Sequence, residues 1–495
     1  MHLKKVILKN FRCFEDLEIP LHPRLTVLVA ENGGGKTSIL DAIAIGLAPL
    51  LSYLSSADQR LNGPGIKDSD FRLSTEHAIA PSSEPDFFSD TLPVTGPGRA
   101  ISDRLLTSGY VQIIVEAISG LRWDNWRAAS KGMQPDTKVG QSDLMAFASS
   151  LLEGFKSTAP KLLPVFAYYG ARRGWIVIPK RLRDSKENYS HPTSALIGSV
   201  DSLSDFAEML KWFDIEESSE LRANVGKPEE KYDKSPALKA VRSTITALLG
   251  GAFINPHFNK KHKFVVDPQT GPGELQVSQL SQGYQSMLAL GMDFARRLAL
   301  ANGHLDTVGD AFDWSFATRN MEGWDAADLK AASQRGPSWA PAIMLVDEID
   351  LHLHPSWQQR VLPDLLRAFP GTQFIVTTHS PQVLSTVDKE SIRIIRTEDA
   401  RAVLKIPEYQ TRGVESADVL ATIMEVDPVP RVPEAKWLSD YRALVENGVH
   451  ATQEGQALRS KLKGHFGESH PLIRDCDRLI RFQGFKRHQP QTGKE

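Results

Sequence analysis

The chain has 495 residues, of which 41% are hydrophobic and 24% charged, and its formal net charge is −2. This length is enough for two or three folded domains, and the near-neutral charge excludes binding to nucleic acid through an overall basic surface. The two cysteines, Cys13 and Cys476, lie far apart, which excludes a disulfide scaffold or a cysteine-ligated zinc site and favours a reducing compartment.

The chain opens with a predicted strand–loop–helix unit. Residues 6–8 and 25–29 have the apolar, β-branched composition of strands, separated by a turn near His22-Pro23, and residues 38–47 follow a helical pattern. Between the second strand and the helix, residues 30–37 read AENGGGKT and match GxxxxGK[ST] except that Ala30 replaces the first glycine. Such a loop wraps its backbone N–H groups around nucleotide phosphates.

Each residue of this loop has an expected role. Lys36 supplies a positive charge to the β- and γ-phosphates, and the Thr37 hydroxyl ligates Mg²⁺. The N-terminal dipole of the following helix also favours the anion. We therefore expect ATP and Mg²⁺ as cofactors, with ATP bound by Asn32, Gly33, Gly34, Gly35, Lys36, Thr37 and Ser38.

The apolar run from Ile39 to Leu54 is long, but it contains Asp41 and Pro49 and follows the phosphate loop. We interpret it as a buried helix and not as a membrane span. The N-terminal residues also lack the apolar core of a secretory signal. These patterns favour a cytoplasmic protein without a membrane partner.

The middle of the chain alternates polar segments with short regular elements. A polar, Ser/Pro-rich surface segment is expected at 55–105 and a basic loop at 178–200. Strands are predicted at 110–117, 121–127, 163–169, 264–266 and 275–277, and helices at 144–155, 203–222 and 236–249. Basic clusters at Arg172-Arg173, Lys180-Arg181-Arg183, Lys260-Lys261-Lys263 and Lys486-Arg487 keep contact with DNA or RNA open, although charge runs usually form solvated faces.

Residues 280–285 read LSQGYQ, fit the pattern LSxGxQ, and begin an apolar helical pattern that extends to Leu300. An apolar strand at 343–346 then ends in Asp347 and Glu348. Asp347 is expected to hold Mg²⁺ through water, and Glu348 to polarise the water that attacks the γ-phosphate. A third strand, 374–377, ends in Thr-His-Ser, where His379 can bond the γ-phosphate.

Two tempting metal sites are better read as structural. His352 and His354 are two residues apart in an extended segment, but no third ligand is nearby, so hydrogen bonding is favoured over metal binding. Asp475 and Asp477 form an Asp-x-Asp pair, but residues 472–482 follow a helical pattern rich in arginine. We therefore interpret this pair as a helix surface and not as a nuclease metal site.

In this order the motifs resemble the ATP-binding-cassette ATPases of the chromosome-maintenance, RecF-like and OLD group. The resemblance implies an α/β fold: an ABC-type P-loop NTPase head with a helical or mixed insertion and a helical C-terminal tail. It implies that Ser281 and Gly283 reach the γ-phosphate held by a partner subunit, that Asp350 lies beside them at the dimer interface, and that Arg12 approaches the nucleotide. No glutamine can be assigned to the Q-loop of this group.

Residues 347–387 and the segment VPEAKWL at 432–438 are similar in sequence to PtuA-like ATPases of Septu-type anti-phage defence, including those that accompany retrons. This resemblance implies a homo-oligomer of ATPase dimers, a small HNH nuclease partner of the PtuB kind, and DNA or RNA as target. Where a retron is present, its reverse transcriptase and nucleic acid are further partners. Only 242 residues separate Thr37 from Leu280, which excludes a long coiled-coil arm.

The expected organisation has four parts: an ATPase N-lobe at 1–54, an insertion and lobe completion at 55–269, an ATPase C-lobe at 270–390, and a helical, partner-binding region at 391–495. The leading function is an ATPase that regulates a defence nuclease through ATP-dependent dimerisation. A DNA-repair or recombination ATPase and a scaffold that binds ATP with little hydrolysis remain as alternatives.

Overall fold

The computed structural model describes residues 1–56, 59–74, 106–155, 161–171, 189, 191–202, 206–271, 273–305, 336–399 and 401–488. By its contacts the chain divides into two compact units, Met1–Val419 and Leu420–Glu495. The predicted basic clusters between Arg172 and Arg183 lie outside the described residues, as does most of the expected surface segment at 55–105.

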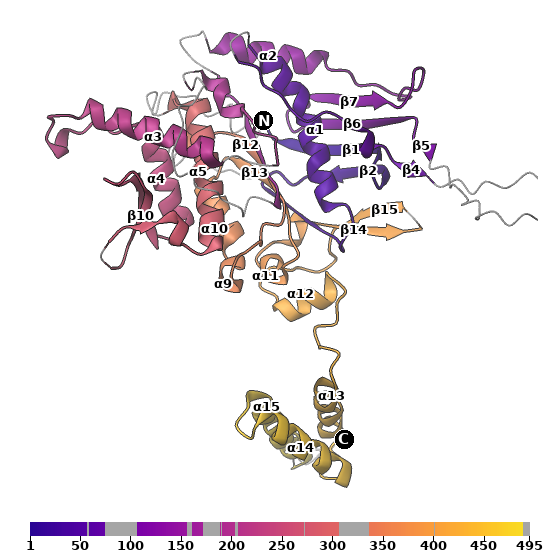
Figure 1. Ribbon diagram of the computed structural model, residues 1–495. Coiled ribbons are helices and arrows are strands. Elements are labelled where there is room, and N and C mark those ends of the chain that lie inside the picture. Colours follow the sequence, from indigo (N-terminus) through magenta and orange to yellow (C-terminus); the bar gives the residue numbers. More distant parts are fainter. Residues whose placement is uncertain are drawn as a thin grey trace, which may run out of the picture. The chain divides into compact units, whose positions relative to one another are not determined.

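The first unit is built around a six-stranded sheet with the order β15-β14-β3-β13-β12-β8 (Figure 1). Its strands are β3 (Leu25–Val29), β8 (Val165–Tyr169), β12 (Ala342–Val346), β13 (Thr372–Thr377), β14 (Ile392–Glu398) and β15 (Arg401–Lys405). All but β15 pair in parallel, and every residue of β3, β8, β12 and β13 is buried. Because parallel strands end at one edge, the loops after β3, β12 and β13 meet there.

A second, antiparallel sheet has the order β2-β1-β6-β7. It contains β1 (Leu3–Phe11), β2 (Phe14–Pro20), β6 (Tyr110–Ala117) and β7 (Arg122–Ala128), with the β6–β7 turn at Gly120 as expected. Strand β2 was not predicted, although Leu17 and Ile19 are buried and alternate with exposed Glu18 and Pro20. This alternation is typical of a half-buried strand, and the turn expected near His22 comes after it.

Helix α1 (Lys36–Leu54) packs between the two sheets, against β6, β7 and β1 on one side and β13 on the other (Figure 1). Among the described residues it is the one helix long and apolar enough to cross a membrane, and 72% of its apolar window is buried inside the protein. Its interior Pro49 and its place in the core agree with the expected buried helix. Helix α2 (Ser142–Gly154) packs beside it.

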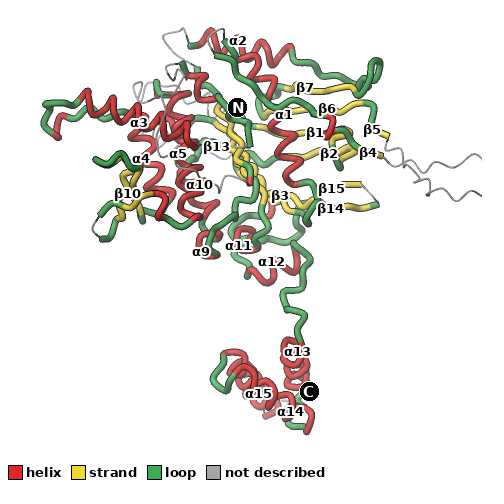
Figure 2. Tube along the Cα trace, in the orientation of Figure 1, coloured by secondary structure: helices red, strands yellow, loops and turns green. Residues whose placement is uncertain are grey.

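Further helices along the chain are α3 (Phe206–Ala223), α4 (Pro236–Leu248), α5 (Gln282–Asn302), α9 (Pro355–Gln358), α10 (Val361–Ala368), α11 (Pro381–Leu384) and α12 (Ser416–Thr422). Of these, α3, α4, α5 and α10 lie on the side of the six-stranded sheet away from α1, and α12 crosses the boundary between the two units (Figure 2). A small sheet with the order β11-β10-β9 consists of β9 (Phe253–Phe258), β10 (Phe264–Pro268) and β11 (Leu275–Gln276). Strands β4 (Leu73–Ser74) and β5 (Leu106–Thr107) form a two-stranded ribbon.

The second unit consists of α13 (Pro433–Glu446), α14 (Gln453–Phe466) and α15 (Pro471–His488). Its own core contains Tyr441, Val445, Leu462, Ile473 and Cys476. Residues 391–405 were expected to be helical with this region, but they form the hairpin β14–β15, which extends the large sheet. Buried isoleucines along β14 pack in the core of the first unit, and this burial explains the difference.

Candidate nucleotide-binding site

The phosphate loop connects β3 to α1, as the sequence predicts. Gly33 and Gly35 adopt left-handed backbone angles, with φ of 81° and 88°. A methyl group on Gly34 would lie 2.7 Å from the Ala30 Cβ, and one on Gly35 would overlap the Phe14 ring, whereas one on Gly33 would meet open space. The glycines therefore allow a tight turn that non-glycine residues would distort, and Ala30 fits within it.

Lys36 lies at the first position of α1, with its side chain folded back over the loop. Its ammonium donates hydrogen bonds to the Ala30 and Glu31 carbonyl oxygens at 2.9 and 3.0 Å. Burial lowers the pKa of Lys36, and this effect outweighs the opposing influence of Asp347, Glu348 and Asp350. A bound phosphate can replace the two loop carbonyls as the partner of this ammonium and form charge-assisted hydrogen bonds with it.

The acidic end of β12 meets the start of α1. The Thr37 hydroxyl donates to Asp347 Oδ2 at 2.9 Å, and the Thr377 hydroxyl at the end of β13 donates to Asp347 Oδ1 at 2.7 Å. The Glu348 backbone N–H in turn donates to Thr377 Oγ1 at 2.7 Å. Thr37 and Asp347 thus present two oxygen groups of the kind Mg²⁺ prefers.

Glu348 has a φ of 50°, a left-handed conformation that is uncommon for a residue with a side chain. The hydrogen bond of its N–H to Thr377 and the backbone bond from Ile349 N to Thr377 O hold the chain in this turn. Backbone conformations of this kind are maintained where the surrounding structure fixes the direction of a functional side chain. The Glu348 carboxylate is only partly buried, so water can reach it.

The segment after β13 is tied to the segment after β12. Asp350 Oδ1 accepts a hydrogen bond from the Thr378 hydroxyl at 2.6 Å and from the His379 backbone N–H at 3.4 Å. The His379 side chain is exposed at the same sheet edge. His354 accepts the Ser356 backbone N–H and caps α9, so its predicted structural hydrogen bonding is confirmed.

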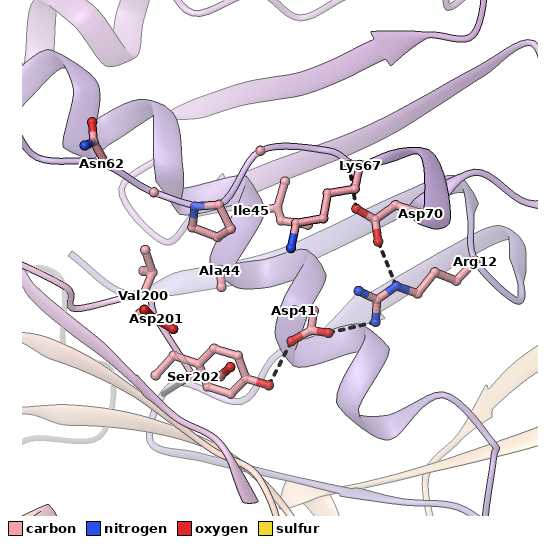
Figure 3. A pocket seen from close by; sticks show the side chains of 14 residues that line it. Arg12, Asp41, Ala44, Ile45, Asn62, Lys67, Asp70, Val200, Asp201 and Ser202 are labelled. Carbon is pink, nitrogen blue, oxygen red and sulfur yellow. Dashed lines mark hydrogen bonds and ion pairs between the residues drawn. The ribbon is translucent and has the colours of Figure 1, made fainter. Parts of the chain in front are cut away.

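Arg12 follows β1 and also has a left-handed φ, of 50°. Its guanidinium pairs with Asp41 on α1 at 2.7 Å and with buried Asp70 at 2.9 Å, and it lies 3.3 Å from the Ser38 hydroxyl (Figure 3). Burial alone would lower the pKa of Arg12, but the hydrogen bonds and charges of Asp41 and Asp70 raise it. Tyr168 donates to the second oxygen of Asp41 at 2.9 Å.

Arg12, Asp41, Asp70 and Tyr168 border a cavity of about 360 Å³ beside α1. Lys67 and the loop at residues 62–65 form its opposite wall (Figure 3). Arg12 therefore lies near the phosphate loop, because it contacts Ser38 directly after that loop. Its charge is already paired with two carboxylates, Asp41 and Asp70. Burial and the Asp41 charge raise the pKa of Tyr168 well above its ordinary value, so its hydroxyl stays protonated and acts as a donor.

The signature sequence lies at the start of α5. Ser281 is the N-cap residue, is exposed, and makes no side-chain capping bond. Gly283 is buried against the segment after β12. The packing is so close that a methyl group on Gly283 would lie 2.9 Å from the His352 carbonyl oxygen. Among the described residues, no hydrogen bond joins Ser281 or Gly283 to Lys36 or Thr37.

The structure thus joins Thr37 of the phosphate loop to Asp347, and Asp350 to the His379 segment. The signature residue Gly283 packs against the segment after β12. Sequence reasoning gave no role to Thr377, Asp41, Asp70 or Tyr168. Thr377 belongs to the recognised strand end, but its bond to Asp347 depends on strand order. Strand β8 pairs with β12, and the residue opposite Val346 is Tyr169. This position therefore does not supply the Q-loop glutamine that the sequence also left unassigned.

A phosphate loop opening a buried helix, an Asp-Glu pair on the neighbouring strand but one, and a separate LSxGxQ helix define an ABC-type P-loop ATPase. One family model, described as an AAA domain, matches residues 5–250. A second, described as "AAA domain, putative AbiEii toxin, Type IV TA system", matches residues 230–385. The protein is an ATPase, and the two AAA-domain models together match residues 5–385.

Relatives make this assignment more specific. The chain is 27% identical to the "Retron Ec83 probable ATPase" of Escherichia coli, over 94% of this chain and 84% of the relative. It is 25% identical to the "Retron Vc95 probable ATPase" of Vibrio cholerae, over 94% and 88%. Septu protein PtuA of Bacillus mycoides is 40% identical over 15% of this chain and 11% of its own length. The predicted relation to retron-associated and Septu ATPases is confirmed.

Solved structures with related folds include an SMC head bound to a winged-helix domain of ScpA, with a TM-score of 0.39 and 15% identity. It is matched over 82% of this chain and 98% of that chain. The SMC head domain from Thermotoga maritima has a TM-score of 0.36, with 83% and 100% coverage and 15% identity.

Proposed function

We propose that this ATPase is the nucleotide-gated subunit of a cytoplasmic anti-phage defence complex. Two copies close around two ATP molecules, and the closed dimer controls an associated HNH nuclease that acts on DNA or RNA. The relation to retron and Septu ATPases supports the defence role. The exposed and uncapped Ser281 at the start of α5 supports the closure.

One observation carries this proposal: the Ser281 side chain is exposed and makes no capping hydrogen bond in its own subunit. Ser281 is exposed at the start of α5 and makes no capping bond, whereas Lys36, Thr37 and Asp347 already contact one another or their own loop. The first turn of a 21-residue helix has unpaired backbone N–H groups that favour an anion. A γ-phosphate held by a partner's loop supplies that anion.

The residues present fit ATP with Mg²⁺. The open space over Gly33 and the ammonium of Lys36 suit the phosphates, and the oxygens of Thr37 and Asp347 suit the metal. Bound Mg²⁺ would neutralise charge on the phosphate oxygens. Glu348 is placed to orient the attacking water, and His379 to donate to the γ-phosphate. These roles, with those of Asn32, Ser38 and Arg12, are proposals from position.

A separate nuclease chain is supported by the C-terminal helices. Asp475 and Asp477 lie on α15, and Asp477 pairs with Arg459 of α14 at 2.5 Å. Cys476 between them is buried in the core of the second unit. Asp477 therefore links α14 to α15, whereas Asp475 pairs with Arg478 on its own helix, and we propose that metal-dependent cleavage belongs to a partner.

The test is to express the chain with the neighbouring genes of its own locus, purify it by an affinity tag, and measure the mass and composition of the complex. An HNH protein that copurifies, together with phage protection lost in Glu348→Gln, is the expected result. A chain that purifies alone from a locus that gives no phage protection would contradict the proposal.

A DNA-repair role remains the second candidate. The DNA replication and repair protein RecF of Lactococcus lactis is 46% identical to this chain, over 12% of it and 17% of RecF. This stretch covers a small share of both chains, so the repair role stands second to the defence role. Sensitivity of a deletion strain to DNA damage, without a change in phage resistance, would favour repair.

A further inference from the structure

An aromatic cluster joins the signature helix to the segment that follows β12. The centre of the Tyr284 ring on α5 lies 4.9 Å from the centre of the Phe253 ring on β9 and 4.6 Å from that of Trp357 on α9. Both pairs are close to edge-to-face. The Arg360 guanidinium lies 5.0 Å from the centre of the Trp357 ring. These four partly buried side chains, here called the aromatic bridge, have no role in the site described above.

One end of the bridge lies in the signature sequence itself. Tyr284 occupies a variable position of LSxGxQ, directly after Gly283. Gly283 packs against the His352 carbonyl and the Leu353 side chain, so the first turn of α5 rests on residues 352–353. The Tyr284–Trp357 contact extends this packing to α9. A displacement of the signature turn must therefore move the segment from 352 to 358.

The other end reaches the loop that carries His379. Gln358, next to Trp357, accepts a hydrogen bond from the Ser380 hydroxyl at 2.7 Å and donates to the Leu353 carbonyl at 2.9 Å. Ser380 is buried and follows His379 directly. Asp350, at the start of the same segment, accepts from Thr378. The segment 350–358 is thus held between the signature helix and the His379 loop.

We infer that Trp357 is a positioning residue that couples the two ATP sites of the dimer. This inference rests on the proposed closure, in which the signature turn of one copy contacts the partner's nucleotide while Glu348 and His379 act on its own. Nucleotide bound at the partner's loop fixes the signature turn, and the aromatic bridge passes that position to residues 350–358 and the His379 loop. Hydrolysis at one site then depends on occupancy of the other.

The physical properties of the bridge suit this task. Aromatic pairs in edge-to-face geometry and a cation over an indole ring have preferred orientations. A movement of the Tyr284 ring therefore moves Trp357 with it. Coupling through such a contact is reciprocal for binding at the two sites. It should appear as cooperative ATP dependence and not as a change in the affinity of a single loop.

The test compares Trp357→Ala and Trp357→Phe with Trp126→Ala. Trp126 is a matched control, because it is also partly buried and has a cation, Lys138, 4.3 Å from its ring centre, but it lies on β7. ATP turnover is measured against ATP concentration, and affinity is measured with a fluorescent ATP analogue. Thermal unfolding reports on folding.

Trp357→Ala should bind nucleotide within about twofold of wild type while kcat falls about tenfold, equivalent to about 1.4 kcal/mol. The Hill coefficient should fall to about one. Trp357→Phe should retain most of the cooperativity, and Trp126→Ala should match wild type. Tyr284→Leu removes the other ring and should give the same loss, which preserves the test if Trp357→Ala lowers the melting temperature.

Unchanged kcat and cooperativity in Trp357→Ala and Tyr284→Leu would overturn the inference, as would an equal loss in Trp126→Ala. Wild-type protein that hydrolyses ATP with a Hill coefficient of about one would instead contradict the two-site closure. The two failures are therefore distinguishable.

Discussion

The Thr37 hydroxyl donates a 2.9 Å hydrogen bond to Asp347, across 310 residues of sequence. The contact exists because β3, which leads to Thr37, and β12, which leads to Asp347, both pair in parallel with β13. Thr377 at the end of β13 completes the link through its own bond to Asp347. The order of three strands thus decides which side chains share the nucleotide site.

Two glycines of the phosphate loop should respond differently to the same substitution. Gly33→Ala places a methyl group in open space, and its left-handed φ should cost about 1 kcal/mol of unfolding free energy. Gly35→Ala has the same backbone strain and also overlaps Phe14, so its total cost should be about 3 kcal/mol. Denaturant unfolding measures both, and equal losses would show that the Phe14 contact yields freely.

The pair formed by Arg12 and Asp70 should matter more than a nearby surface pair. Asp70 is buried, and Asp70→Asn leaves the Arg12 guanidinium with only Asp41, which should cost about 2 kcal/mol. Asp68 pairs with Arg127 but is 91% exposed, so Asp68→Asn should change stability by less than about 0.5 kcal/mol. Urea unfolding of both variants decides this, and similar effects would contradict the assigned importance of burial.

A buried carboxylate on α5 should contribute to acid sensitivity. Burial alone would raise the pKa of Asp293, but the charges of Arg297 and Arg296 and the Tyr169 hydrogen bond lower it to about 2. Because the folded-state pKa is below the ordinary value, this stabilisation is present above pH 4 and is lost as pH falls through 2. The shift corresponds to about 2 kcal/mol at neutral pH.

Asp293→Asn should therefore lower stability at pH 7 and flatten its dependence on pH between about 4 and 2. Unfolding curves at several pH values provide the measurement. A variant whose stability falls with acid as steeply as that of wild type would show that other carboxylates dominate this window.

The chemistry-bearing loops were predictable because each is local. The glycines and Lys36 are contiguous, and the acids at 347–348 directly follow an apolar strand, so spacing alone indicates their roles. The helix after the loop was predictable for the same reason. The resemblance in motif order supplied the fold class.

Contacts that join distant segments were not predictable. Asp41 on α1 bonds to Arg12, which follows β1, and to Tyr168 on β8. No local sequence pattern predicts that these three elements lie together. Strand β2 was missed because it is short and only its last four residues alternate, and β14–β15 because the tail was assigned as a whole to helices. Strand order and tertiary packing decide such cases, and sequence patterns describe them poorly.

The closure of two subunits around ATP is tested most directly by molar mass in solution. Glu348→Gln should bind ATP without hydrolysing it, so light scattering should report an increase in mass on addition of ATP and Mg²⁺. Adding Ser281→Arg should abolish that increase while nucleotide affinity stays within a few-fold, because Ser281 is exposed and does not contact its own loop. Ser130→Arg, at another exposed serine, is the control and should still associate. If the Ser281→Arg protein still closes around ATP, the signature sequence is only the start of a helix, and the proposed dimer is wrong.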